Sequence, residues 1–296
     1  MASKKKKKAA GLRRSCGAMG VHMMLLEKYP AFRAHQFKLE RETARVRAAE
    51  LDLARVELAT IKVIVHVVYK TDAQNISNAQ IASQIKALNK DFRAQNPDRS
   101  KVPTPWKGLV TDSRIQFKLD DVTRTQTTRA SFGSDDSVKH ASSGGIAPVD
   151  TSKYLNLWVC ALGGGLLGYA QFPGGPKSTD GVVINYRAFG TNGSAEAPFN
   201  KGRTATHEVG HYFNLRHIWG DTEDCSGSDF VADTPNSAGP NYQTPAFPSV
   251  SCNNGPNGDM FMNYMDYTDD EAMFMFTTQQ VARMRTALEN RRSGLL

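Results

Sequence analysis

The chain has 296 residues, of which 40% are hydrophobic and 22% are charged, a balance typical of a globular protein with a buried core. No run of about 20 apolar residues occurs, which excludes an ordinary membrane-spanning helix, and we expect no membrane partner. The net charge of +8 is concentrated at one end: five lysines at residues 4–8, with Arg13 and Arg14, supply seven positive charges and leave +1 for the rest.

The basic segment at residues 4–14 has the composition of a nucleic-acid or acidic-surface binder. No basic binding face follows it, so we interpret it as a tail and expect no nucleic-acid partner. The segment is basic like the start of a secretory signal peptide, but no apolar region follows. We expect either that a leader has been removed or that none is used.

Residues 1–60 differ in composition from residues 61–296, which we expect to form the main domain. The second half of the N-terminal segment alternates acidic and basic residues at helical spacing. This pattern predicts an exposed helix that is weakly tied to any core.

Five strands are predicted in the main domain, at residues 61–70, 114–122, 154–162, 163–175 and 180–190. Glycines bound the fourth, which favours a place at the sheet edge. An amphipathic helix with Ser77 as N-cap is predicted at residues 75–96, and a final helix at 277–292. The stretch 221–263 is irregular. The order predicts an α+β domain with a mixed five-stranded sheet above a loop-rich lower part.

The chain has four cysteines, Cys16, Cys160, Cys225 and Cys252, which allow three full pairings. Cys225 and Cys252 lie in the same loop-rich segment, where a disulfide would restrain irregular backbone. Such a bond would indicate an oxidising compartment and a secreted protein. Two free thiols are the alternative.

Three of the seven histidines lie within "HEVGHYFNLRH", residues 207–217. On a helix, His207 and His211 are four residues apart and face the same side, where both can bind one metal ion. Two imidazoles suit Zn²⁺, and Glu208 beside them can act as general base for a water molecule. His217 reaches the same ion only if the chain turns back after the helix. Asn214 is suited to that turn because asparagine tolerates a left-handed backbone.

These residues resemble the HExxHxxGxxH pattern of the metzincin zinc peptidases, and of their pappalysin family in particular, with Asn214 in place of glycine. "NYMDY" at residues 263–267 is similar to the family's methionine turn, with Met265 beneath the metal and Tyr267 beside it. The resemblance extends through "HVVY", "LNLWVC", "VADTPN" and "SCNNGPNGDMFMNYMDYTDD" and covers most of residues 60–290.

The resemblance implies a metzincin-type catalytic domain at 61–296 and an N-terminal pro-segment at 1–60. It implies a latent, monomeric, secreted endopeptidase for proteins or peptides, with catalytic Glu208 and Tyr267. "RSCG" resembles a cysteine switch, in which Cys16 fills the fourth zinc position of the latent form.

The resemblance also implies calcium, for which the acidic loop after His217 offers oxygen ligands, including Asp229 and Asp233. Asp270 follows the methionine turn, where the primed-side pocket is expected, and its carboxylate would favour Arg or Lys after the scissile bond. Arg55 is then a candidate site of self-cleavage.

Two other functions fit parts of the pattern. A zinc hydrolase of non-peptide substrates would use the same ligands, and a non-catalytic binding module could be stabilised by the same ion. Glu208 argues against the second alternative, because a structural zinc site needs no base and usually closes all four positions.

Overall fold

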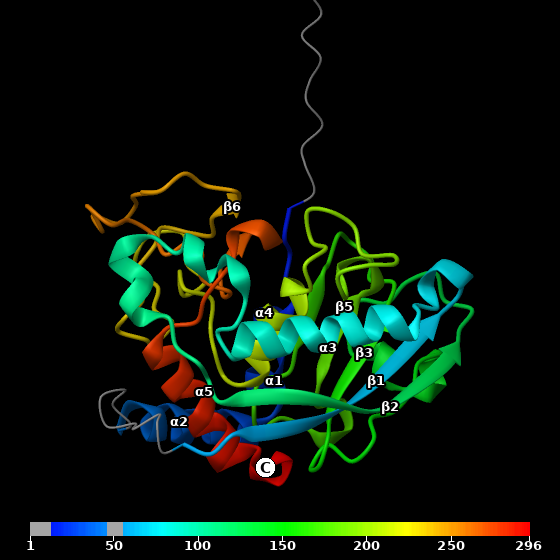
Figure 1. Ribbon diagram of the computed structural model, residues 1–296. Coiled ribbons are helices and arrows are strands. Elements are labelled where there is room, and N and C mark those ends of the chain that lie inside the picture. Colours follow the sequence, from blue (N-terminus) through cyan, green and yellow to red (C-terminus); the bar gives the residue numbers. More distant parts are fainter. Residues whose placement is uncertain (1–12, 46–55) are drawn as a thin grey trace, which may run out of the picture.

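The computed structural model describes residues 13–45 and 56–296. Its main feature is one twisted five-stranded sheet with helices packed on both faces (Figure 1). The strands are β1 (Ala59–Tyr69), β2 (Ile115–Gln126), β3 (Leu155–Cys160), β4 (Gly168–Ala170) and β5 (Val182–Asn185). The helices are α1 (Ala18–Lys28), α2 (Pro30–Arg45), α3 (Asn78–Phe92), α4 (Arg203–Tyr212) and α5 (Thr278–Arg291). The predicted α+β class with a mixed five-stranded sheet is confirmed.

The strand order is β2-β1-β3-β5-β4, and every neighbouring pair is parallel except β4 with β5. The central strands are nearly continuous runs of apolar residues, as expected for strands that are covered on both faces. The predicted glycine-bounded strand is β4, which lies at the sheet edge as expected.

Alternate residues of the sheet contribute to two separate apolar clusters. Val63, Val65 and Val67 belong to the larger cluster, together with residues of α3, α4 and α5. The opposite face contributes Val68 and Trp158 to a smaller cluster that α1 completes. The N-terminal segment is therefore packed into a core of the protein.

Side chains cap the starts of α3 and α5, and the cap at Ser77 is as predicted. Ser77 accepts a hydrogen bond from the Gln80 backbone at the start of α3. Thr277 forms a reciprocal capping box with Gln280 at the start of α5. Both predicted helices are confirmed, with boundaries shifted by a few residues.

The prediction of a weakly attached N-terminal helix is wrong for the described part. Phe32 and Leu39 of α2 are buried, and the helix packs beside α5 at the lower left of Figure 1. The sequence suggested an exposed helix because the charged side chains outnumber these few apolar contacts. Residues 46–55, with the candidate cleavage point Arg55, lie outside the described residues.

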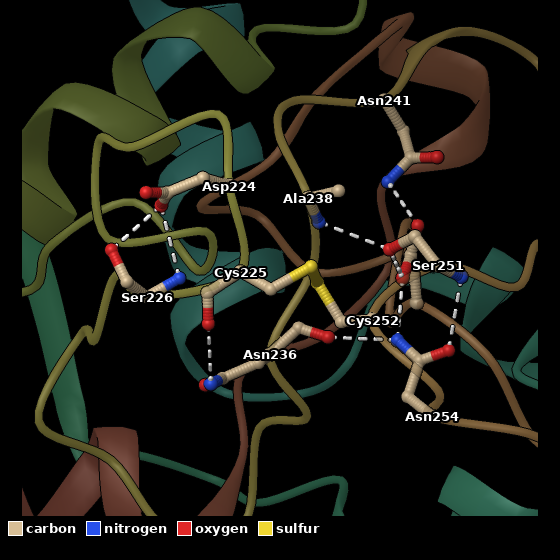
Figure 2. The surroundings of a disulfide bond; sticks show 10 residues. Asp224, Cys225, Ser226, Asn236, Ala238, Asn241, Ser251, Cys252 and Asn254 are labelled. Atoms are coloured by element: carbon tan, nitrogen blue, oxygen red, sulfur yellow. Dashed lines mark hydrogen bonds between the residues drawn. A yellow bond between two sulfur atoms is a disulfide. The ribbon is translucent and has the colours of Figure 1, made fainter.

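The lower part of the domain is irregular, as predicted, apart from short paired strands β6 (Tyr242–Gln243) and β7 (Tyr267–Thr268). A disulfide joins Cys225 to Cys252 across this part (Figure 2), while Cys16 and Cys160 are free thiols. The Asn236 side chain donates to the Cys225 carbonyl, and the Asn254 side chain donates to the Asn236 carbonyl. Side-chain hydrogen bonds and one disulfide therefore hold this irregular backbone together. No helix in the described residues combines the length and apolar character needed to cross a membrane.

Candidate active site

Helix α4 carries the first two histidines and the glutamate, and all three side chains are buried. The rings of His207 and His211 are 4.7 Å apart between centroids, as the four-residue spacing predicts. Glu208 projects from the same helix toward the edge strand β4. A Cβ atom at Gly168 would lie only 2.9 Å from Glu208 Cγ, so the glycine lets the strand approach the helix closely.

The chain reverses at Asn214, which has a left-handed backbone with φ of 73°. The Leu215 backbone N–H donates to the Gly210 carbonyl at 2.9 Å and closes the helix end. Arg283 of α5 donates from Nε to the Asn214 carbonyl at 2.6 Å. The predicted turn is present, and it brings His217 back to the two histidines of α4.

The three Nε2 atoms converge. They lie 3.1 Å apart for His211 with His207, 3.1 Å for His211 with His217, and 3.3 Å for His207 with His217. Each Nδ1 atom faces an oxygen. His207 Nδ1 lies 2.7 Å from the Tyr264 carbonyl oxygen, and His211 Nδ1 lies 2.8 Å from the Leu215 carbonyl oxygen. His217 Nδ1 lies 2.5 Å from Asp221 Oδ1. These acceptors place the protons on Nδ1, so three Nε2 lone pairs point at one another.

Three converging lone pairs repel one another unless a cation lies between them. Burial and the neighbouring imidazoles lower the pKa values of His207 and His211, which keeps both rings neutral and able to bind metal. Tetrahedral coordination at about 2.0–2.1 Å would separate the nitrogens by about 3.3–3.4 Å, close to the spacing found. The residues therefore fit a metal ion.

Cys16 completes this group. Its sulfur and the three imidazole nitrogens all lie within 4.8 Å of one another, and within residues 13–45 and 56–296 this is the one such cluster found. Cys16 Sγ is 3.3 Å from Glu208 Oε2. Burial and the neighbouring Glu208 raise the pKa of the Cys16 thiol, and burial raises the pKa of Glu208 to about 8.

Backbone pairing with the sheet edge holds Cys16 in place. The Leu167 N–H donates to the Ser15 carbonyl at 3.0 Å, and the Gly17 N–H donates to the Gly168 carbonyl at 2.9 Å. The N-terminal segment therefore adds a short extended stretch to the sheet, parallel to β4.

The structure places Met265 and Tyr267 around the histidines. Met265 is fully buried, and its Sδ would lie 2.5 Å from a Cβ atom at Gly210, so the missing side chain of that glycine makes room for the methionine. The Tyr267 ring lies 4.9 Å from the His217 ring, and its hydroxyl donates to the Cys16 carbonyl at 3.5 Å.

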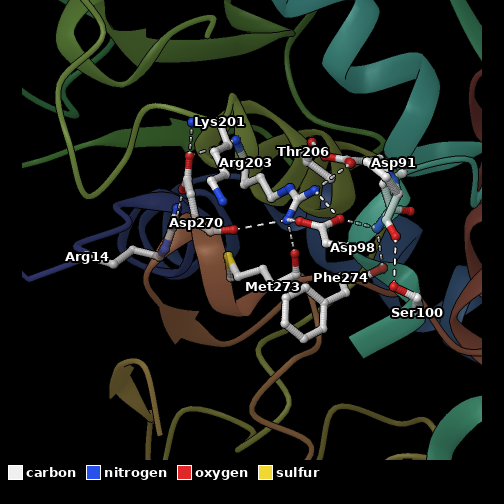
Figure 3. Close-up of polar contacts among 12 residues, drawn as sticks. Arg14, Asp91, Asp98, Ser100, Lys201, Arg203, Thr206, Asp270, Met273 and Phe274 are labelled. Carbon is white, nitrogen blue, oxygen red and sulfur yellow. Dashed lines mark hydrogen bonds and ion pairs between the residues drawn. The ribbon is translucent and has the colours of Figure 1, made fainter. Parts of the chain in front are cut away.

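Asp270 lies at one end of a largely buried polar network (left in Figure 3). Arg14 Nη2 donates to Asp270 Oδ1 at 2.6 Å, while its other nitrogens donate to Thr204 Oγ1 and the Thr268 carbonyl. The other carboxylate oxygen accepts the Lys201 backbone N–H at 2.7 Å. Asp270 is thus held from behind by the backbone and faces the guanidinium of the N-terminal segment.

The predicted calcium ligands do not gather into a cluster. Asp229 accepts from the Thr234 hydroxyl at 2.8 Å, and Asp233 accepts from the Thr277 hydroxyl at 2.6 Å and the Gln279 N–H at 2.9 Å. Asp229 is thus bonded within its own loop, and Asp233 is bonded to donors at the start of α5.

Two residues of the site were not singled out for these contacts from the sequence. Arg14 belongs to the basic tail and begins the "RSCG" stretch, but the sequence predicts no contact between it and Asp270. Asp221 was grouped with the acidic loop, yet it accepts from His217 Nδ1. Its four-residue offset from His217 was the available clue.

Comparisons with known proteins agree with this geometry. The Peptidase M43 family model, described as pregnancy-associated plasma protein-A, matches residues 146–289. An extracellular metalloprotease of Arthroderma otae is 32% identical over 246 residues, covering 79% of this chain and 80% of that protein. One of Pyricularia oryzae is 34% identical over 252 residues, covering 81% and 79%.

Solved structures give the same result over most of the chain. Mirolysin in complex with a compound matches with a TM-score of 0.79 and 49% identity, covering 81% of this chain and 96% of that chain. A promirolysin mutant of Tannerella forsythia matches with a TM-score of 0.85 and 43% identity, covering 95% and 97%. The chain therefore belongs to the pappalysin family (Peptidase M43) and is a metalloendopeptidase with the metzincin fold.

Proposed function

We propose that the protein is a zinc-dependent endopeptidase whose metal is held by His207, His211 and His217. The observation that carries this proposal is the convergence of three buried Nε2 atoms, each imidazole being fixed through Nδ1 by an oxygen acceptor. Three neutral imidazoles with one open position are a common ligand set of catalytic zinc.

When bound, Zn²⁺ would lower the pKa of a water ligand to about 7 and polarise the scissile carbonyl. Glu208 would accept a proton from the attacking water and deliver it to the leaving amine, for which its burial and raised pKa are suited. The Tyr267 hydroxyl would donate to the developing oxyanion. Met265 would support the histidines from below through its packing against Gly210.

An extended peptide would bind along the edge of the sheet at β4. Such a chain would use the Leu167 N–H and the Gly168 carbonyl of this edge. In the present structure these groups form hydrogen bonds with Ser15 and Gly17 of the N-terminal segment. Mature mirolysin of Tannerella forsythia has been solved in complex with a cleaved peptide, and this supports peptide substrates here.

Asp270 would select Arg or Lys immediately after the scissile bond. The support is that Arg14 already places a guanidinium against this carboxylate, two residues from the cysteine beside the metal ligands. A buried carboxylate with backbone donors behind it is poorly matched to an apolar side chain.

Residues 1–60 would form a pro-segment that keeps the catalytic domain at 61–296 latent. Cys16 would fill the fourth metal position and exclude the attacking water, and its raised pKa means that thiolate formation depends on the bound cation. The likeness to promirolysin supports this proposal. The relatives named extracellular metalloproteases support a secreted enzyme, which we propose is a monomer.

A structural calcium ion is a separate proposal for the loop that contains Asp229 and Asp233. It requires rearrangement of the hydrogen bonds that these carboxylates now make.

The test of the proposed function is metal analysis, with zinc and calcium counted separately, combined with casein cleavage after removal of the pro-segment. We expect one zinc per chain in the parent and in Glu208→Ala, with cleavage lost only in the variant. A metal-loaded parent that cleaves neither casein nor peptides would instead support a non-catalytic module, and activity on esters alone would support a non-peptide hydrolase.

A further inference from the structure

Besides the packing of α1 in the smaller apolar cluster, the N-terminal segment contacts the rest of the protein in two separate places. Residues 14–17 lie against the metal ligands and β4, whereas α2 lies against α5. Only the first contact is needed to block a metal site. The second contact has its own apolar and charged chemistry.

We propose that the face of α5 beneath α2 is a binding surface for an amphipathic helix that presents glutamates to it, and that its occupant after activation is the cleaved pro-segment. The cut segment then stays bound as a dissociable inhibitor, so cutting the chain is not sufficient for activity. This inference rests on the proposed latency.

The charges on the two helices are complementary. Glu40 of α2 accepts two hydrogen bonds from the Arg283 guanidinium, one of them at 2.7 Å from Nη1 to Oε2. The Arg283 side chain is only 1% exposed. A second pair joins Glu42 to Arg291 at 2.8 Å. A bidentate pair around a buried guanidinium is strong and directional, and loss of its carboxylate leaves an unpaired buried charge.

The apolar contacts give the helix one buried face. Phe32, Gln36 and Leu39 are buried at spacings of four and three residues, the pattern by which a helix docks on a surface. Phe32 packs in the smaller apolar cluster, and Gln36 Nε2 donates to the Pro173 carbonyl at 2.6 Å, so this part of the helix contacts α1 and the segment after β4 beside the α5 face.

A cut between α2 and β1 breaks none of these contacts. α2 ends at Arg45 and β1 begins at Ala59, and the contacts of α2 described above come from residues before this link. Cleavage removes only the covalent tether, which keeps the pro-segment at a high effective concentration near its binding surface. The dissociation constant of the cut segment then sets how fast activity emerges.

Arg283 connects this surface to the metal site. The guanidinium that binds Glu40 also donates to the Asn214 carbonyl, at the turn that returns His217. The bound helix and the turn therefore share one positively charged side chain.

The test uses the full chain with Glu208→Gln, to prevent self-cleavage, and Cys16→Ser, to remove the sulfur ligand. A recognition site for a specific protease replaces part of residues 46–55, and the cut protein is followed by size-exclusion chromatography in a dilution series. We expect the two fragments to co-elute at micromolar concentration. Glu40→Gln should weaken the complex by at least about tenfold. The matched control is Glu27→Gln, on an exposed position of α1, and should leave the complex unchanged.

Separation of the fragments at micromolar concentration without Glu40→Gln would overturn the proposal, and so would equal behaviour of Glu40→Gln and Glu27→Gln. The zinc content of the same samples and the activity of the chain with Glu208 intact report on the proposed function independently. A failure of fragment binding is thereby distinguished from a failure of the peptidase assignment.

Discussion

The guanidinium of Arg14 lies 2.6 Å from the carboxylate of Asp270, and both side chains are almost fully buried although 256 positions separate them in the chain. Arg14 also lies with its guanidinium carbon 5.0 Å from the centre of the Phe199 ring, so the cation is enclosed on several sides. The N-terminal segment thus places a basic side chain where we propose that the substrate places one.

Asp270→Asn should therefore change cleavage specificity. The amide keeps the shape and most acceptor contacts but removes the charge, and we expect about 100-fold lower kcat/KM for substrates with Arg or Lys after the scissile bond. Profiling of a peptide library on the processed enzyme measures this. The control is Asp269→Asn at the neighbouring, partly exposed position. An unchanged preference in Asp270→Asn would exclude the pocket assignment.

Cys16→Ser should remove latency without proteolysis. A serine hydroxyl is a much poorer metal ligand than a thiolate, so water can reach the fourth position while α1 and α2 stay folded. The intact variant should cleave a short peptide at least about tenfold faster than the intact parent. Cys160→Ala, which removes the other free thiol, is the control and should stay latent. If intact Cys16→Ser is as inactive as the parent, the thiol is not what blocks the site.

Gly210→Ala should destabilise the domain through Met265. The added Cβ would lie 2.5 Å from Met265 Sδ in a fully buried position. Overpacking of this kind costs about 1–3 kcal/mol of unfolding free energy. Thermal unfolding measures the loss, and Gly20→Ala provides a helical control because its Cβ would meet nothing within 4 Å. Equal melting temperatures for Gly210→Ala and the parent would show that the methionine is free to move.

Acidification should release the cut pro-segment through His22. Burial above all, together with the charges of Arg216 and Arg283 and against the opposing effect of Asp221, lowers the pKa of His22 from 6.5 to about 3. Neither ring nitrogen has a hydrogen-bond partner within the described residues, and the Phe172 ring lies 4.4 Å away. The released segment binds a proton below pH 6.5 that the docked segment cannot accept. Docking should thus be unaffected above pH 6.5 and weaken by about tenfold per pH unit between 6.5 and 3.

Fragment binding at pH 7.5 and pH 5 measures this effect. We expect about 30-fold weaker binding at pH 5, and a much smaller change for His22→Leu. His35→Leu, at an exposed position on α2, should behave like the parent. The same pH dependence in His22→Leu and the parent would assign the effect to other groups.

Features that depend on local sequence were predicted well. The His207–His211 spacing, the left-handed Asn214 and the Ser77 cap each follow from a few consecutive residues and the geometry of a helix. The edge strand was identifiable because glycines bound it. In each case the relevant contact lies within a short distance along the chain.

The family resemblance predicts that Cys16 and Met265 lie beside the metal ligands, but other contacts between distant segments were not predicted. Arg14 meets Asp270, and Glu40 meets Arg283, across more than 240 positions, and neither partner carries a local signal for the other. The charged surface of α2 suggested exposure because its docking depends on two buried apolar residues and on arginines far along the chain. Asp221 looked like any loop carboxylate until the turn at Asn214 placed it beside His217.

Zinc K-edge X-ray absorption on the intact chain tests the central claim most directly. We expect one zinc with three imidazole nitrogens at about 2.0–2.1 Å and one sulfur at about 2.3 Å, and loss of the sulfur alone in Cys16→Ser. Fewer than three imidazoles, or a sulfur signal that persists in Cys16→Ser, would contradict the assignment of His207, His211, His217 and Cys16 to one metal ion.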